Sequence, residues 1–122
     1  MIRSIAVLLA AGVGAVARYA LDEVVEHRTS GVFPWGTLVV NVSGSFLLGL
    51  VTGLALHHGL PRTPTVVLGA GFAGGYTTFS TWAWESLALV EARASVATVG
   101  NVVGSVAAGL LAAAAGLGLA LV

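Results

Sequence analysis

Four long apolar stretches, separated by short polar segments, dominate the pattern of this chain. The stretches cover residues 4–21, 37–56, 66–89 and 96–122. Each has about the 20 residues that a helix needs to cross a bilayer. The segments between them, residues 22–35, 57–64 and 91–93, carry the charged residues or prolines that end the apolar runs. The pattern predicts an all-α membrane protein with four transmembrane helices in a single domain, residues 1–122.

The third stretch is interrupted by polar residues at membrane depth. The run from Gly74 to Glu85 contains two glycines, three threonines, a serine and a glutamate. Because glycine and threonine are poor helix formers, an unwound turn here would free carbonyl oxygens. We expect the third helix to break near Gly74–Thr78; the alternative is a kink whose hydroxyls bond back to their own backbone. Polar groups inside a membrane mark a functional site by default.

The composition supports a membrane setting and excludes several other classes. Hydrophobic residues make up 57% of the chain and charged residues only 8%, with a mean hydropathy of +1.00. A soluble domain has roughly 25% charged residues. The absence of cysteine excludes disulfides and thiolate metal sites. Residues 69–74 match GxGxxG, but a dinucleotide site needs a strand and a soluble sheet around that loop, so we reject it.

The few positive charges are almost evenly divided between the two sides that four spans define. Arg3 and Arg62 lie on one side, and Arg28 and Arg93 lie on the other, with Arg18 near the end of the first span. A fixed orientation usually needs a clear excess of positive charge on the cytoplasmic side. Arg18 inside the first span also argues against a removed signal peptide. We expect the chain to insert in both orientations.

Four helices of this length enclose little space, so a polar path through them needs walls from a partner. A chain that inserts both ways supplies that partner as an antiparallel copy of itself with two-fold symmetry. Glycines four residues apart let helices approach closely, at Gly49/Gly53, Gly71/Gly75 and Gly100/Gly104. Each pair serves packing within the chain, contact between two copies, or exposure of the backbone at a site. The prediction is an antiparallel, dual-topology homodimer.

Three motifs point to one family. They are GAVARY at residues 14–19, GTLVVNVSGSF at residues 36–46 and GFAGGYTTFST at residues 71–81. With these motifs in this order and spacing, the sequence resembles the Fluc (CrcB) family of small fluoride channels over nearly its whole length. The resemblance implies an antiparallel dual-topology homodimer with two fluoride pores and a structural sodium ion at its centre.

The resemblance also implies roles for particular residues. A fluoride pathway would be lined by Asn41, Thr78, Phe79, Ser80, Trp82, Asn101 and Ser105. The backbone carbonyls of Gly74 and Thr77, doubled by the dimer axis, would bind sodium. Vestibule or supporting roles would fall to Arg18, Thr37 and Glu85. The chain departs from the family at Trp82, where phenylalanine is usual, and at Asn101, where tyrosine is frequent.

The chemistry of these side chains allows both functional and structural interpretations. The positive edge of the Phe79 ring can face an anion, and the indole of Trp82 adds an N–H donor; an aromatic pair three residues apart is otherwise core packing. The amide of Asn41 is either an anion donor or a polar clasp between helices. Asn101 and Ser105, four residues apart, share one helix face.

The two charged candidates are also open to more than one interpretation. Arg18 either anchors the first helix by reaching the interface or forms a positive vestibule that draws anions in. Glu85 either pairs with Arg18 or lies near the pore mouth.

The leading hypothesis is passive, selective export of fluoride across a prokaryotic plasma membrane, which confers fluoride resistance, and no enzymatic activity. The expected partners are fluoride, the lipid bilayer and a second copy of the chain, with no nucleic acid. A proton-coupled small multidrug transporter needs a carboxylate in its first helix, and residues 4–21 have none. A non-transporting assembly subunit would carry no ion flux.

Overall fold

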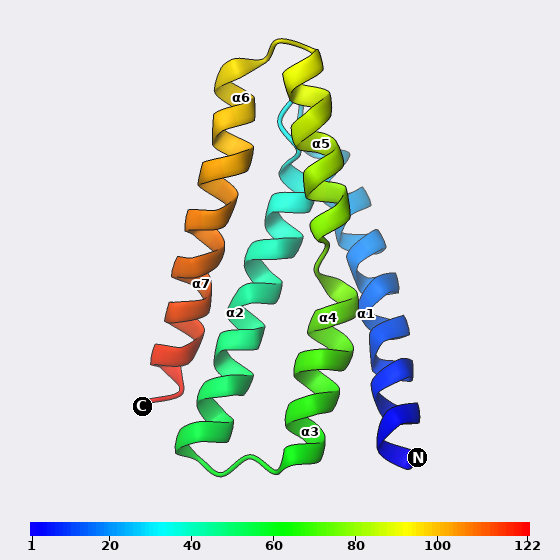
Figure 1. Ribbon diagram of the computed structural model, residues 1–122, viewed down its shortest axis with the longest axis vertical. Helices are drawn as coiled ribbons and strands as arrows, with labels where there is room; N and C mark the ends of the chain where they lie inside the picture. The colour runs from blue at the N-terminus through cyan, green and yellow to red at the C-terminus, as the bar shows by residue number, and fades with distance from the viewer.

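A computed structural model describes residues 1–122 and is entirely helical. The elements are α1 (Ile2–Glu26), α2 (Trp35–His57), α3 (Arg62–Val66), the π-helix η1 (Val67–Ala73), α4 (Gly74–Tyr76), α5 (Phe79–Glu91), α6 (Ser95–Val99), the π-helix η2 (Gly100–Gly104) and α7 (Ser105–Leu119). In space α3, η1 and α4 form one continuous rod, and α6, η2 and α7 form another (Figure 1).

Three helical rods are long and apolar enough to cross a membrane: Ile2–Glu26, Trp35–His57 and Ser95–Leu119. The chain is therefore a multi-pass integral membrane protein. The remaining rod, residues 62–91, is divided between α4 and α5. Its break is narrower than the sequence predicts, because Gly74–Tyr76 stays helical and only Thr77 and Thr78 adopt extended backbone.

The polar segment after the first apolar stretch is more helical than its composition predicts. We expected the first helix to end near residue 21, but α1 continues to Glu26. The carboxylate of Glu26 then accepts a hydrogen bond from the backbone N–H of Gly36 at 3.0 Å. This bond satisfies one of the unpaired N–H groups in the first turn of α2, which explains why a charged residue ends the preceding helix.

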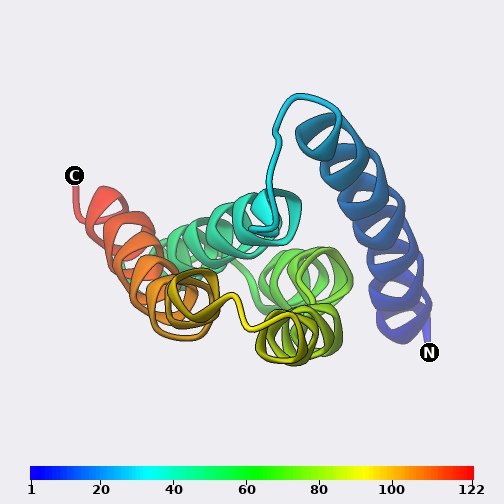
Figure 2. The same cartoon turned by 90° about the horizontal axis from the view of Figure 1, so that it is seen from above.

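Successive rods run in alternating directions along the molecule (Figure 1). Both termini and the connection between α2 and α3 lie at one end of the molecule, and the other two connections lie at the opposite end (Figure 1). Arg3 and Arg62 therefore share one end, as predicted. Seen from above, α2 occupies the middle, with α7 on one flank and the broken rod between α2 and α1 (Figure 2).

Glycines at the close crossings serve packing within the chain. A Cβ atom on Gly49 would overlap the backbone of Ala113 in α7, and one on Gly75 would overlap the backbone of Ala11 in α1. Gly53 and Gly71 face the same two helices. Of the three interpretations open from the sequence, packing within the chain is the one that the Gly49/Gly53 and Gly71/Gly75 pairs follow.

Candidate functional site

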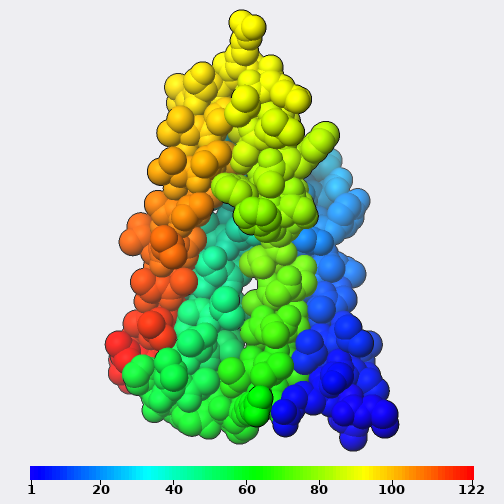
Figure 3. Space-filling model, in the orientation of Figure 1, coloured from blue at the N-terminus to red at the C-terminus, as the bar shows by residue number.

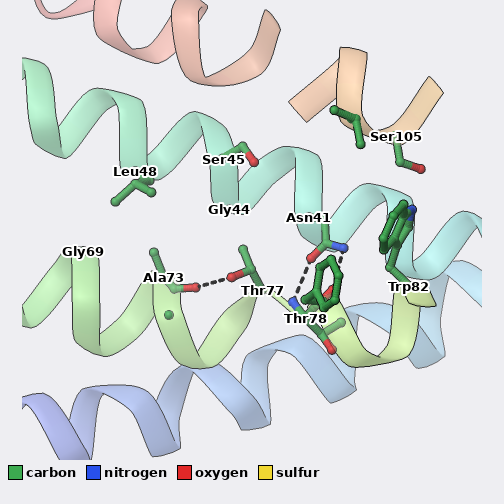
Figure 4. Close-up of a pocket in the computed structure, with 13 residues that line it drawn as sticks. Asn41, Gly44, Ser45, Leu48, Gly69, Ala73, Thr77, Thr78, Trp82 and Ser105 are labelled. Carbon is green, nitrogen blue, oxygen red and sulfur yellow. Dashed lines mark hydrogen bonds between the residues drawn. The ribbon is translucent and has the colours of Figure 1, made fainter. Parts of the chain in front are cut away.

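The break in the third rod is held by a side chain from α2. The amide of Asn41 accepts a hydrogen bond from the backbone N–H of Thr78 at 2.8 Å and donates one to the carbonyl of Thr78 at 2.9 Å (Figure 4). Thr78 is only 8% exposed, so both backbone groups need a partner. Asn41 thus replaces the helical hydrogen bonds that the extended backbone cannot make. Of the two roles that the sequence allowed for Asn41, it therefore has that of a polar clasp between helices.

Thr78 also begins the next helix. Its hydroxyl oxygen accepts a hydrogen bond from the N–H of Thr81 at 3.2 Å, the standard arrangement of a helix N-cap. The same hydroxyl donates to the Thr81 hydroxyl at 2.9 Å and lies 3.4 Å from the Ser80 hydroxyl. A threonine at this position therefore ends the break and starts α5.

The two carbonyls that the resemblance assigns to sodium have lost their helical partners. In a continuous helix the Gly74 carbonyl would accept from the N–H of Thr78, and the Thr77 carbonyl would accept from that of Thr81. Those N–H groups bond to Asn41 and to the Thr78 hydroxyl instead. The Thr77 carbonyl receives only a long contact from Arg18 Nη1, at 3.4 Å.

Freed carbonyl oxygens of this kind fit a hard cation such as sodium. No cluster of three or more histidine, aspartate or glutamate side chains is placed to hold a metal ion.

A groove of about 370 Å³ opens beside the break, between α2, the broken rod and α7. The residues that line it are Asn41, Gly44, Ser45, Leu48, Gly69, Ala73, Gly74, Thr77, Thr78, Phe79, Trp82, Ser105 and Val106. In the space-filling view the surface is hollowed between α2 and the broken rod (Figure 3). Five of the predicted pathway residues meet here, whereas Ser80 and Asn101 do not line the groove.

The two aromatic side chains of the pathway lie against each other at the groove. The ring centroids of Phe79 and Trp82 are 5.2 Å apart with the planes tilted by 44°. Phe79 is 77% exposed, so it is not a core residue of this chain. Trp82 is more enclosed, and its N–H donates to the backbone carbonyl of Asn101 at 2.9 Å.

Asn101 lies behind the groove wall at the centre of a polar network. Its side chain is fully buried. It donates from Nδ2 to the Ser86 hydroxyl at 3.0 Å and accepts at Oδ1 from the Ser105 hydroxyl at 3.2 Å. Ser86 in turn donates to the backbone carbonyl of Trp82 at 2.7 Å. Asn101 therefore connects α5 to η2, and the two departures from the family pattern, Trp82 and Asn101, contact each other.

Arg18 lies on the opposite side of the break. With Thr37 and Thr78 it lines a smaller pocket of about 170 Å³. The carboxylate of Glu85 accepts from the Thr37 hydroxyl at 2.8 Å, and its second oxygen is buried without a partner. Arg18 and Glu85 form no ion pair, so that sequence-based alternative is wrong: the carboxylate is held by Thr37, while the guanidinium extends to the Thr77 carbonyl.

Sequence reasoning missed two residues of the site. Ser45 lines the groove, and Ser86 completes the network behind it. The available signal was spacing, because Ser45 follows Asn41 by four residues and Ser86 follows Trp82 by four.

The fold and the site define a multi-pass membrane protein in which a polar helix break, clasped from a neighbouring helix, borders an aromatic groove. The family model described as "CrcB-like protein, Camphor Resistance (CrcB)" matches residues 5–117. The chain belongs to this family, as the motifs predicted.

Two relatives illustrate the similarity. The protein "Fluoride-specific ion channel FluC 1" of Leifsonia xyli subsp. xyli is 51% identical over 94% of this chain and 82% of its own length. The protein "Fluoride-specific ion channel FluC 2" of Mycobacterium bovis is 46% identical over 92% of this chain and 86% of its own length. Relatives named as ion channels place the chain in a non-enzymatic family.

Proposed function

We propose that this protein is a fluoride-selective channel that lets cytoplasmic fluoride leave passively and so confers fluoride resistance. The observation that carries the proposal is the clasped break beside a groove that contains amide, hydroxyl and aromatic-edge groups. The names of its relatives supply the ion. Hydrogen fluoride enters cells as a neutral weak acid and dissociates there, and the negative-inside potential drives the trapped anion out.

Selectivity follows from the character of the groove. Its lining combines a few polar groups with Gly, Ala, Leu and Val positions, so an anion entering it must exchange water for protein donors. Donors held in fixed places can replace the hydration shell of a small ion in the way that channel filters do. Chloride is larger and would fit the same donors poorly.

The channel is proposed to be an antiparallel dimer of chains with four membrane crossings each, the third made by residues 62–91. The groove is open along one side in the single chain, and Phe79 is exposed beside it. A second copy in the opposite orientation would close this side and create two equivalent pathways.

A structural sodium ion is proposed at the centre of that dimer. The carbonyls of Gly74 and Thr77 lack their helical partners, and two from each copy would surround a cation on the symmetry axis. A structure of the dimer determined in sodium should show one density between them. A continuous helix through Thr78, with every carbonyl bonded, would contradict this assignment.

Fluoride efflux from liposomes that contain the purified protein tests the proposed function. With a potassium gradient and valinomycin to carry the balancing charge, we expect rapid fluoride release at a fluoride electrode and no comparable chloride release. No flux of either ion would favour an assembly subunit. Proton-coupled export of cationic compounds without fluoride flux would favour a multidrug transporter.

Insertion of two lysines after His57 is expected to bias the chain toward one orientation. Because an antiparallel pair needs both orientations, fluoride flux should fall severalfold when this variant is expressed alone. Labelling of a single introduced cysteine from each side of the membrane would report the orientation. Co-expression with a variant biased the other way should restore the flux; full flux from a single-orientation population would contradict the antiparallel dimer.

A further inference from the structure

We propose that fluoride is bound in the groove by one face of α2, through the hydroxyl of Ser45 and the second amide proton of Asn41, and not by the hydroxyl of Ser105. The inference rests on the proposed function and names the donors of that same site. The donors available to an anion are those whose polar protons are not already used in hydrogen bonds within the chain.

The hydroxyls of the broken rod are not free. The Thr77 hydroxyl donates to the carbonyl of Ala73 at 2.9 Å, four residues earlier. The Thr78 hydroxyl donates to the hydroxyl of Thr81 at 2.9 Å. Each hydroxyl has a single proton, so neither threonine can donate to an anion without breaking a bond that shapes the break.

The hydroxyl proton of Ser105 is already used in the hydrogen-bond network around Asn101, behind the residues that line the groove. Ser86 uses its one proton on the carbonyl of Trp82, so its oxygen accepts from Asn101. The amide nitrogen of Asn101 therefore faces Ser86, and the amide oxygen must face Ser105.

Ser105 consequently donates its hydroxyl proton to Asn101 and not into the groove. Its hydroxyl proton lies on Asn101 Oδ1, and its lone pairs are left for the groove. An anion that took this proton would strand the oxygen of a fully buried amide, which is unfavourable. The indole N–H of Trp82 is also unavailable to an anion, because it donates to the backbone carbonyl of Asn101.

The donors that remain are on α2. The other hydroxyls of this helix are already used: Ser43 and Thr52 donate to the carbonyls of Val39 and Leu48, four residues earlier and both at 2.7 Å. Thr37 donates to Glu85. Ser45 lines the groove, and its hydroxyl makes no hydrogen bond within the chain. In Figure 4 it is drawn on the same ribbon as Asn41, whose dashed bonds run only to Thr78.

The spacing and the surroundings of these two donors suit a small anion. Asn41 and Ser45 are four residues apart and share a helix face. Asn41 uses one amide proton on the Thr78 carbonyl and retains the other. Gly109 lies across from Ser45, where an added Cβ would stand 3.4 Å from its hydroxyl oxygen, so the absent side chain leaves room beside the donor.

Three single substitutions test the inference in the fluoride-efflux assay. Ser45→Ala is expected to lower the initial rate at least about tenfold and to raise the half-saturating fluoride concentration, because it removes one hydrogen bond to a charged group. Ser105→Ala removes the donor to the buried Asn101 Oδ1 and so is expected to lower the melting temperature, but it should leave the half-saturating fluoride concentration unchanged, since its proton does not serve the anion. Thr52→Ala removes an α2 hydroxyl that does not line the groove, and it should leave the rate unchanged. Size-exclusion chromatography checks that each variant forms the same dimer as the wild type.

Wild-type flux from Ser45→Ala would overturn the inference, and so would a rise in the half-saturating fluoride concentration of Ser105→Ala as large as that of Ser45→Ala. Either result leaves the proposed function intact, because the wild-type protein still carries fluoride. A wild-type protein that carries no fluoride would overturn the proposed function, and the assignment of fluoride donors with it.

Discussion

Replacing Asn41 by leucine is expected to lower the fluoride flux at least about a hundredfold, a barrier increase of about 2.7 kcal/mol. Leucine has nearly the same size but offers no hydrogen bonds. The N–H and carbonyl of Thr78 would lose both of their partners while remaining almost buried. Each stranded group costs about 1–3 kcal/mol, so the break itself should rearrange or loosen.

Two further variants test whether the loss of fluoride flux in Asn41→Leu comes from the missing hydrogen bonds to Thr78. Asn41→Asp keeps an acceptor for the Thr78 N–H but turns a second oxygen toward the Thr78 carbonyl, so it should also lose most of the flux. Val39→Leu changes an exposed apolar residue of α2 outside the groove and should transport normally. A falling melting temperature in detergent would accompany the Asn41 variants alone. Asn41→Leu at the wild-type rate would remove the clasp from the mechanism.

The helices were predictable because their cause is local in sequence. Long apolar runs interrupted by charge or proline can only cross a membrane as helices, since the bilayer offers the backbone no hydrogen bonds. The extent of the break was not predictable in the same way. Helix propensity alone marked Gly74 as a point of unwinding, but the hydrogen bonds of Asn41 select Thr78 instead, and these depend on the packing of α2 against the rod.

The sequence predicted some of the residues of the site. It did not predict which acceptor each polar proton binds. Spacing placed Phe79 and Trp82 on one helix face, the family resemblance assigned Ser105 to the same pathway, and all three line the groove. The acceptor that each polar proton binds depends on contacts between different helices, such as the hydrogen bond from Asn101 to Ser86. Sequence patterns do not contain that information, which is why Ser45, quoted only as part of a motif, went unassigned.

Phe79→Ile is expected to lower the fluoride flux at least about tenfold, a barrier increase of about 1.4 kcal/mol. Phe79 lines the groove, and most of its surface is exposed in the single chain. The edge of its ring carries partial positive charge, which attracts an anion that the ring face would repel. Isoleucine keeps much of the apolar bulk without that charge distribution, so the fold and the dimer should survive.

Two other aromatic residues of α5 provide the comparison. Trp84 is exposed but does not line the groove, so Trp84→Ile should transport at the wild-type rate. Trp82→Ile removes both the ring beside Phe79 and the N–H bond to Asn101, and its loss of flux would combine these effects. If Phe79→Ile carries fluoride normally while Trp82→Ile does not, the anion contacts belong to the edge of the indole. The pathway must then be redrawn around Trp82.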